Sequence, residues 1–155
     1  MEVKELTKDE HGKLNGAVLH DKQTGATFTR RARVIVNCAG IHADFVRRMD
    51  DPDAEDRIVG ARGTHIMLPR GILPKGQGLL IPDTADGRLV FILPYDEGYT
   101  IVGTTDDKCE ITHFPKQEEK DVEFLVRETG RLLGKDYDVR GNIKAVWSGI
   151  RPLVK

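Results

Sequence analysis

The chain has 155 residues, of which 39% are apolar and 32% are charged, and its formal net charge at pH 7 is -1. These values are typical of a globular domain large enough to bury a core, and they exclude a disordered polar chain. The small net charge gives no electrostatic case for a nucleic-acid partner. Two cysteines, Cys38 and Cys109, have neither zinc-ligand spacing nor disulfide-scaffold density, so we predict no metal site and a reducing compartment.

The chain opens inside an apparent strand and stops at Leu153-Val154-Lys155 just as another finishes. No apolar run approaches the roughly 18 residues of a membrane-spanning helix, and the first ten residues lack the apolar centre of a signal peptide. We therefore interpret the chain as an internal segment of a longer protein.

The first third of the sequence is rich in short β-type runs. Val34-Ile35-Val36 is a continuous β-branched run, which is typical of a strand buried on both faces of a parallel sheet. With the turn residues His11 to Lys13 and Lys22 to Gly25, the pattern predicts four strands: Val3–Leu6, Gly16–His20, Ala26–Thr29 and Arg33–Asn37.

A small-residue turn follows the fourth predicted strand. Asn37-Cys38-Ala39-Gly40 leads into a segment of helical character over Ile41–Met49. This order lets a ligand approach backbone amides at a helix N-terminus. A tight connection in which Gly40 only relieves crowding is the structural alternative.

The second part of the sequence predicts an antiparallel sheet with one covering helix. Its strongest signal is a hairpin from Leu89 to Asp106, with two β-rich runs around Asp96-Glu97-Gly98. We expect further strands at Gly63–Pro69, Leu79–Ile81 and Val146–Leu153, and a solvated acidic connector at Asp50–Asp56. The helix is predicted over Gln117–Leu133, with one apolar stripe: Val122, Leu125, Val126, Thr129, Leu132 and Leu133.

Three features of this sheet could carry chemistry. Arg151 ends a tryptophan-bearing strand, where a guanidinium pairs with a ligand phosphate or carboxylate, or with a carboxylate of the protein itself. His65 lies near a strand start and is the one general-base candidate at neutral pH, or else a hydrogen-bonded structural residue. Thr104, Thr105 and Asp106 either orient a ligand or close a turn.

Five blocks of the sequence carry a family resemblance. They are Val34–Asp44, Gly63–Pro69, Val90–Tyr95, Ile101–Asp106 and Trp147–Leu153. In this order and spacing they resemble the flavin-dependent glycerol-3-phosphate dehydrogenases, the quinone-reducing respiratory enzymes of bacterial membranes and of the mitochondrial inner membrane.

The resemblance implies FAD as cofactor, sn-glycerol 3-phosphate as substrate, quinone as electron acceptor and a parent protein bound peripherally to its membrane. It further implies that His65 is the catalytic base beside the reacting hydroxyl. Arg151 and Thr105 would bind the substrate, while Ala39, Gly40 and Gly149 would contact the cofactor.

The resemblance also shows what this chain lacks. The family's N-terminal glycine-rich motif for the FAD pyrophosphate is absent from it, as are a later arginine and a C-terminal Gly-Gly-Lys segment. We therefore expect the isolated chain to be inactive. A glycerol-3-phosphate oxidase, which uses oxygen as acceptor, and a non-catalytic binding module remain as alternatives.

The predicted fold is α+β, mainly an antiparallel sheet with a covering helix. Residues 51–155 would form the substrate-binding domain of a two-domain FAD oxidoreductase. Residues 1–50 would belong to its FAD-binding domain, where the strand at Val34 to Val36 would pair with a strand from elsewhere in the parent protein.

Overall fold

The computed structural model describes residues 1–96 and 98–155, which divide into two compact units. The first comprises Met1–Ile58 with Val154–Lys155, and the second comprises Val59–Leu153. The domain boundary predicted between residues 50 and 51 stays a prediction. Within the first unit, the buried Asp44 Oδ2 accepts the backbone N–H groups of Arg57 and Ile58 at 2.9 and 2.8 Å.

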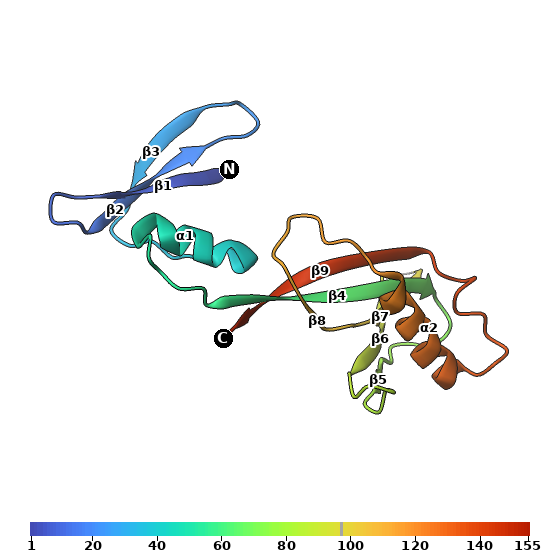
Figure 1. The fold of residues 1–155 in the computed structure, drawn as a ribbon. Coiled ribbons are helices and arrows are strands. Elements are labelled where there is room, and N and C mark those ends of the chain that lie inside the picture. Colours follow the sequence, from blue (N-terminus) through green and yellow to red (C-terminus); the bar gives the residue numbers. More distant parts are fainter. Residues whose placement is uncertain (97) are drawn as a thin grey trace. The chain divides into compact units, whose positions relative to one another are not determined.

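The first unit contains a three-stranded antiparallel sheet of β1 (Glu2–Lys8), β2 (Leu14–His20) and β3 (Thr27–Arg31), in the order β1-β2-β3 (Figure 1). Gly12 and Gly25 take positive φ angles of 76° in the two connecting turns, as their predicted turn positions require. A 3₁₀ turn (Gly40–His42) and helix α1 (Ala43–Asp50) follow. The first three predicted strands and the predicted helix are confirmed.

The fourth predicted strand, Arg33–Asn37, is wrong for this structure. These residues form no strand, and Val34 and Val36 are each 76% exposed. Ile35 lines a cavity of about 320 Å³ together with Leu6 and Val46. A strand needs a neighbour to pair its backbone groups, and within the described residues this segment has none.

The second unit is built on a six-stranded sheet, in which β7 and β8 both pair antiparallel with β4 (Figure 1). Its strand order is β5-β6-β7-β4-β8, and β9 also pairs with β4. The strands are β4 (Ile58–Pro69), β5 (Leu79–Ile81), β6 (Val90–Tyr95), β7 (Tyr99–Gly103), β8 (Asp107–Cys109) and β9 (Ala145–Val154).

The predicted hairpin is confirmed as β6 and β7, which pair from Phe91 with Gly103 to Tyr95 with Tyr99. Glu97 of its turn lies outside the described residues. The short β8 was not predicted, because two charged residues and one cysteine in an acidic stretch carry no strand pattern.

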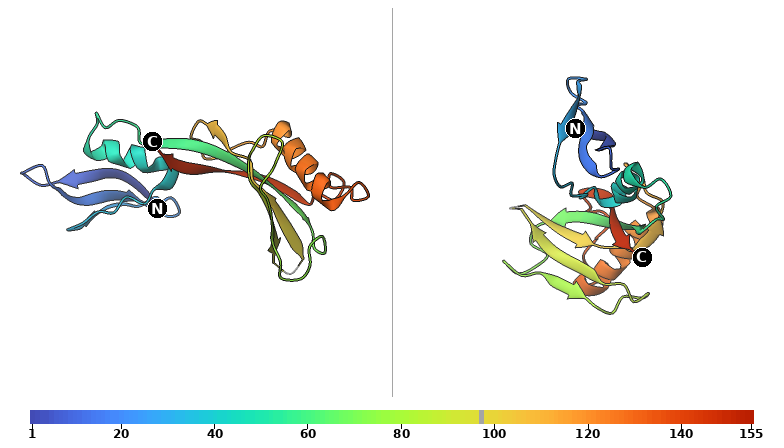
Figure 2. Two further views of the ribbon diagram at one scale, coloured as in Figure 1. Left: turned by 90° about the horizontal axis from the view of Figure 1, so that it is seen from below. Right: turned by 90° about the vertical axis from the view of Figure 1, so that its left-hand side faces the viewer.

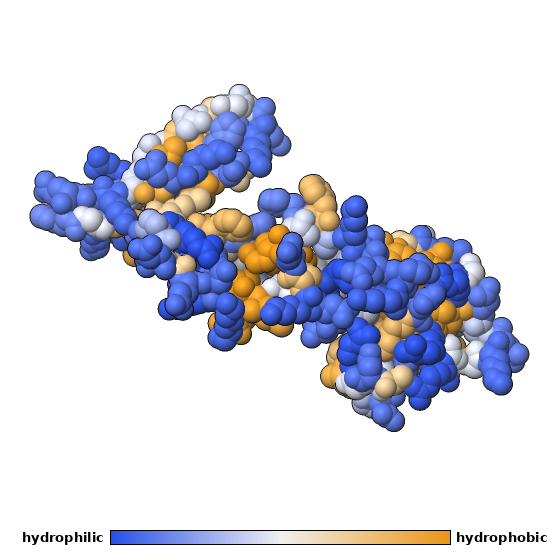
Figure 3. Space-filling model, viewed as in Figure 1, coloured by the Kyte–Doolittle hydropathy of each residue, from blue (hydrophilic) through white to orange (hydrophobic). Residues whose placement is uncertain are grey.

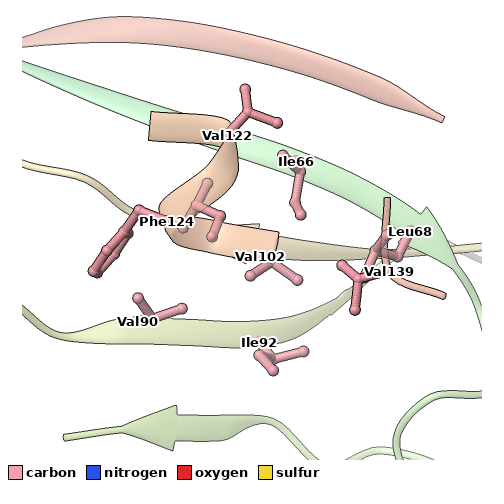
Figure 4. Close-up of a cluster of buried hydrophobic side chains, with 9 residues drawn as sticks. Ile66, Leu68, Val90, Ile92, Val102, Val122, Phe124 and Val139 are labelled. Atoms are coloured by element: carbon pink, nitrogen blue, oxygen red, sulfur yellow. The ribbon is translucent and has the colours of Figure 1, made fainter. Parts of the chain in front are cut away.

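Helix α2 (Glu119–Leu133) packs against one face of this sheet (Figure 2). The apolar side chains between the two layers form the core of the unit (Figure 4). They are Ile66, Leu68, Val90, Ile92, Val102, Val122, Phe124, Leu125 and Val139. The predicted helix is confirmed, but Leu132 is 46% exposed, because the buried face turns instead toward Asp121, Phe124 and Glu128.

The six-stranded sheet therefore has two unlike faces. We call the side packed by α2, which carries Ile66 and Leu68 of β4, the covered face. Alternation along the strands directs His65 to the opposite side, the open face, where Phe91 and Leu93 are 42% and 47% exposed. An α+β fold with a mainly antiparallel sheet and one covering helix is confirmed.

Polar and charged residues dominate the surface seen in Figure 3, with hydrophobic residues exposed on both units. Among the residues described, no helix has the length and apolar character needed to cross a bilayer.

Candidate active site

Arg151 is the centre of a polar group at one end of the open face. Its Nη2 donates to Thr104 Oγ1 at 2.8 Å, and its Nη1 donates to Asp106 Oδ1 at 3.1 Å and to the Thr105 carbonyl at 3.3 Å. The side chain keeps 36% exposure. A guanidinium that is fixed by hydrogen bonds within the protein and is partly exposed can bind an anion with little further loss of side-chain freedom.

Glycine at position 63 makes room for this arginine. A Cβ atom at Gly63 would lie 2.3 Å from Arg151 Nη2 and 2.5 Å from Thr104 Oγ1. Every other residue type would therefore displace the guanidinium, so the Gly63-Thr64-His65 sequence serves Arg151 as well as the strand.

His65 lies two residues along β4 and stacks on Trp147 of β9. The ring centroids are 5.4 Å apart and the planes differ by 9°. His65 pairs with Gly103 across β4 and β7, where a Cβ would come within 2.2 Å of the imidazole Cδ2. The imidazole ring therefore lies between the Trp147 indole and the backbone of Gly103.

The surroundings of His65 favour its neutral form. Burial lowers the pKa of the imidazole below its usual 6.5, and the positive charge of Arg151 lowers it further. The buried Nδ1 has no hydrogen-bond partner among the residues described. A neutral imidazole at neutral pH has a free lone pair, which is the state that a general base needs.

The hydroxyl of Thr105 is buried and hydrogen-bonded to the backbone. Thr105 is fully buried, and its Oγ1 accepts the backbone N–H of Thr64 at 2.9 Å. Its carbonyl oxygen accepts from Arg151. In this geometry Thr105 holds the strand and the arginine, and direct contact between its side chain and a substrate stays a prediction.

A buried charged network on the covered face was missed from the sequence. Asp121 is 1% exposed, and its Oδ2 accepts from Thr64 Oγ1 at 2.9 Å and lies 3.2 Å from Arg62 Nη2. Arg62 also donates to Glu118. The signal was present: Asp121 lies four residues before Leu125, which puts its carboxylate on the apolar stripe, where a charge requires partners.

The residues predicted to contact the cofactor belong to different units. In the first unit, Gly40 opens the 3₁₀ turn with φ of +56°, and Ala39 N donates to Asn37 Oδ1 at 3.2 Å. In the second unit, Gly149 is exposed on β9. A Cβ added at Gly40 or Gly149 would have nothing within 4 Å, so backbone is presented to open space at both positions.

Gly12, Gly25 and Gly71 present equally open backbone, so contact of FAD with Ala39, Gly40 or Gly149 stays a prediction. Within residues 1–96 and 98–155, no three His, Cys, Asp or Glu side chains come together as a metal site.

The whole chain, residues 1–155, matches the family described as FAD dependent oxidoreductase. The chain belongs to this family. The family name specifies FAD as the cofactor.

Two curated relatives carry more specific names. A probable mitochondrial glycerol-3-phosphate dehydrogenase of Dictyostelium discoideum is 42% identical over 161 residues, which cover 99% of this chain and 25% of that protein. The mitochondrial glycerol-3-phosphate dehydrogenase of Homo sapiens is 43% identical over 143 residues, covering 92% of this chain and 20% of that protein. The chain thus spans a quarter or less of the length of these relatives.

Solved structures extend the likeness to the fold. The glycerol-3-phosphate dehydrogenase of Bacillus halodurans, complexed with FAD, superposes with a TM-score of 0.88 at 27% identity over all of this chain and 31% of that one. Glycine oxidase of Geobacillus kaustophilus gives a TM-score of 0.69 at 21% identity, which reports on the fold alone.

Proposed function

We propose that this chain is part of an FAD-linked dehydrogenase that oxidises sn-glycerol 3-phosphate to dihydroxyacetone phosphate. The observation that carries the proposal is the pairing, on one face of one sheet, of an anchored but half-open Arg151 with a neutral His65 stacked on Trp147. The names of the relatives that are 42% and 43% identical support the same substrate.

Arg151 would bind the substrate phosphate. Its planar guanidinium can give two parallel charge-assisted hydrogen bonds to phosphate oxygens. Thr104 and the Thr105 carbonyl hold it in place meanwhile, so little side-chain entropy is lost on binding.

His65 would remove the proton of the C2 hydroxyl. Its stack on Trp147 fixes the ring plane, and its lowered pKa keeps the imidazole unprotonated near neutral pH. FAD, when bound, supplies the acceptor for the hydride that leaves C2. Ala39, Gly40 and Gly149 would lie against the cofactor through their backbone atoms.

The proposal extends to domains and location. Residues 1–50 would complete the FAD-binding domain of the parent protein, and residues 51–155 would form its substrate-binding domain. The parent protein would pass electrons to quinone while bound peripherally to the mitochondrial inner membrane or to a bacterial cytoplasmic membrane. The relatives' mitochondrial names support the first of these locations.

The test is anaerobic reduction of bound flavin in the full-length protein that contains this chain. We expect glycerol 3-phosphate to bleach the oxidised flavin absorbance and glycine, the substrate named for the fold relative, to leave it unchanged. The His65→Ala variant should retain flavin and reduce it about 10²- to 10⁴-fold more slowly. Flavin that glycerol 3-phosphate leaves oxidised in the wild type would refute the proposal.

Two further measurements separate the alternatives. Hydrogen peroxide formed in step with turnover would identify an oxidase, whereas reduction of added quinone without peroxide identifies the dehydrogenase. The 155-residue chain alone should show neither activity, since its sequence contains no glycine-rich motif for the FAD pyrophosphate.

A further inference from the structure

Asp121 is a buried carboxylate to which the proposed reaction assigns no role. It lies in the first turn of α2 with 1% exposure, and burial and the nearby Asp107 carboxylate raise its pKa. The charged groups around it are Arg62 of β4, Asp107 of β8 and Glu118 before the helix, and Arg88 also lies close to Asp107. A group this costly to bury, at the back of a candidate site, calls for a function.

The hydrogen bonds of Asp121 have a fixed direction. The Thr64 hydroxyl has one proton, which it donates to Asp121 Oδ2 at 2.9 Å. Thr64 Oγ1 must then be the acceptor in its 2.8 Å contact with Ser148 Oγ, so Ser148 is the donor. Two consecutive hydrogen bonds therefore run from Ser148 through Thr64 to Asp121 and join β9, β4 and α2.

These hydrogen bonds lie on the covered face, directly behind the candidate site. Thr64 stands between Gly63 and His65 on β4, and Ser148 stands between Trp147 and Gly149 on β9. Because side chains alternate along a strand, a bond between positions 64 and 148 on the covered face fixes how positions 65 and 147 meet on the open face. From the same strand β9, the Arg151 guanidinium reaches the Gly63 position of β4.

We propose that Asp121 is a positioning residue, which acts through the Thr64 and Ser148 hydroxyls to hold His65 against Trp147 and to keep the Arg151 guanidinium beside Gly63. The geometric part stands on the contacts above, whereas its consequence for catalysis rests on the proposed function.

The geometric part is tested on the 155-residue chain by fluorescence. Trp147 is its single tryptophan, and a protonated imidazole stacked on an indole quenches its emission. We expect an acid quench with a midpoint below pH 6.5 in the wild type. Thr64→Val removes the hydroxyl at constant shape and should remove most of this quench, while Thr64→Ser, which keeps the hydroxyl, should restore it.

Thr129→Val is the matched control. Thr129 is an equally buried threonine whose Oγ1 has no hydrogen-bond partner in the described part of the chain. Its replacement should leave the quench unchanged. If Thr64→Val folds, as judged by circular dichroism, and quenches like the wild type, the proposal is wrong.

Asp121→Asn provides a second variant should Thr64→Val not fold. The amide oxygen can still accept from Thr64 while the charge is lost, so the quench should survive in Asp121→Asn and disappear in Asp121→Leu. Equal quenching in the two variants would overturn the positioning role.

The catalytic part needs the full-length flavoprotein. There Thr64→Val should lower kcat by up to about 10²-fold, the effect of a misplaced group, and raise KM, while Thr64→Ser restores both. If the fluorescence result holds but kcat and KM do not change, the positioning role survives and the catalytic roles of His65 and Arg151 fail.

Discussion

The two faces of the six-stranded sheet use the same strands for opposite purposes. On the covered face, Ile66, Ile92 and Val102 are completely buried under α2. On the open face, the neighbouring Phe91 and Leu93 keep nearly half of their surface in solvent, and His65 and Arg151 lie among polar contacts. Packing on one face therefore supplies the rigidity with which the other can arrange charged and aromatic groups.

The largest expected effect is the loss of stability when a side chain buried between α2 and the covered face is shortened. Leu125→Ala removes a fully buried side chain from α2 and should reduce the free energy of unfolding by about 2–5 kcal/mol. Leu132→Ala makes the same change on the same helix at a position that is 46% exposed, and should cost about 0.5 kcal/mol. Urea denaturation of the two variants measures the difference, and equal losses would contradict the assignment of the covered face.

The next effect concerns a residue of the open face, whose loss should change substrate binding and leave stability nearly the same. Arg151→Ala in the full-length protein should raise KM for glycerol 3-phosphate roughly 10- to 150-fold, as expected for a lost charge-assisted contact of about 1.5–3 kcal/mol. Arg151→Lys, which keeps the charge without the planar fork, should fall between. Thermal unfolding should change little, since the ion pair with Asp106 is exposed. An unchanged KM would remove Arg151 from the site.

A pair of glycines sharpens the comparison within the open face. Gly103→Ala places a Cβ within 2.2 Å of the His65 ring and should destabilise the chain by about 1–3 kcal/mol while displacing the imidazole from Trp147. Gly149→Ala meets no atom within 4 Å and should leave stability unchanged. It should instead weaken flavin binding in the full-length protein. Denaturation and flavin titration report the two results, and flavin binding as tight as the wild type's would dissociate Gly149 from the cofactor.

The smallest effect is a pH dependence of stability. The pKa of His65 is lower in the folded chain than the 6.5 of a free imidazole, so the unfolded chain binds the proton more readily. The stability contribution of neutral His65 is therefore fully present above pH 6.5 and is lost as the pH falls through the folded pKa. His65→Gln should lose less stability than the wild type between pH 7 and pH 5 in parallel thermal melts. Parallel curves for the two proteins would count against the buried, neutral state.

Local pattern was enough to predict most of the fold. The hairpin of β6 and β7 and the helix α2 follow from periodicity and turn chemistry. The strand predicted at Val34 to Val36 is wrong because a strand forms only where a second segment pairs with it. The pattern of one segment does not show whether such a partner exists.

For the candidate site, the family resemblance alone predicts roles for His65, Arg151 and Gly149, since weighed singly the histidine and the arginine have structural alternatives. These roles stay predictions. The Asp121 network was missed because acidic residues are common in the first turn of a helix, even though this one lies on the apolar stripe four residues before Leu125. Its partners lie about 60 residues away along the chain, at Arg62 and Thr64, so no local pattern joins them.

The unpartnered Nδ1 of His65 has a consequence for proton placement. In a Ser-His-Asp triad, a carboxylate on one ring nitrogen fixes which tautomer is present. Here a stack and a glycine hold the ring, and among the residues described no hydrogen bond selects the nitrogen that carries the proton. The ligand that binds beside His65 would therefore determine which of the two ring nitrogens carries the proton.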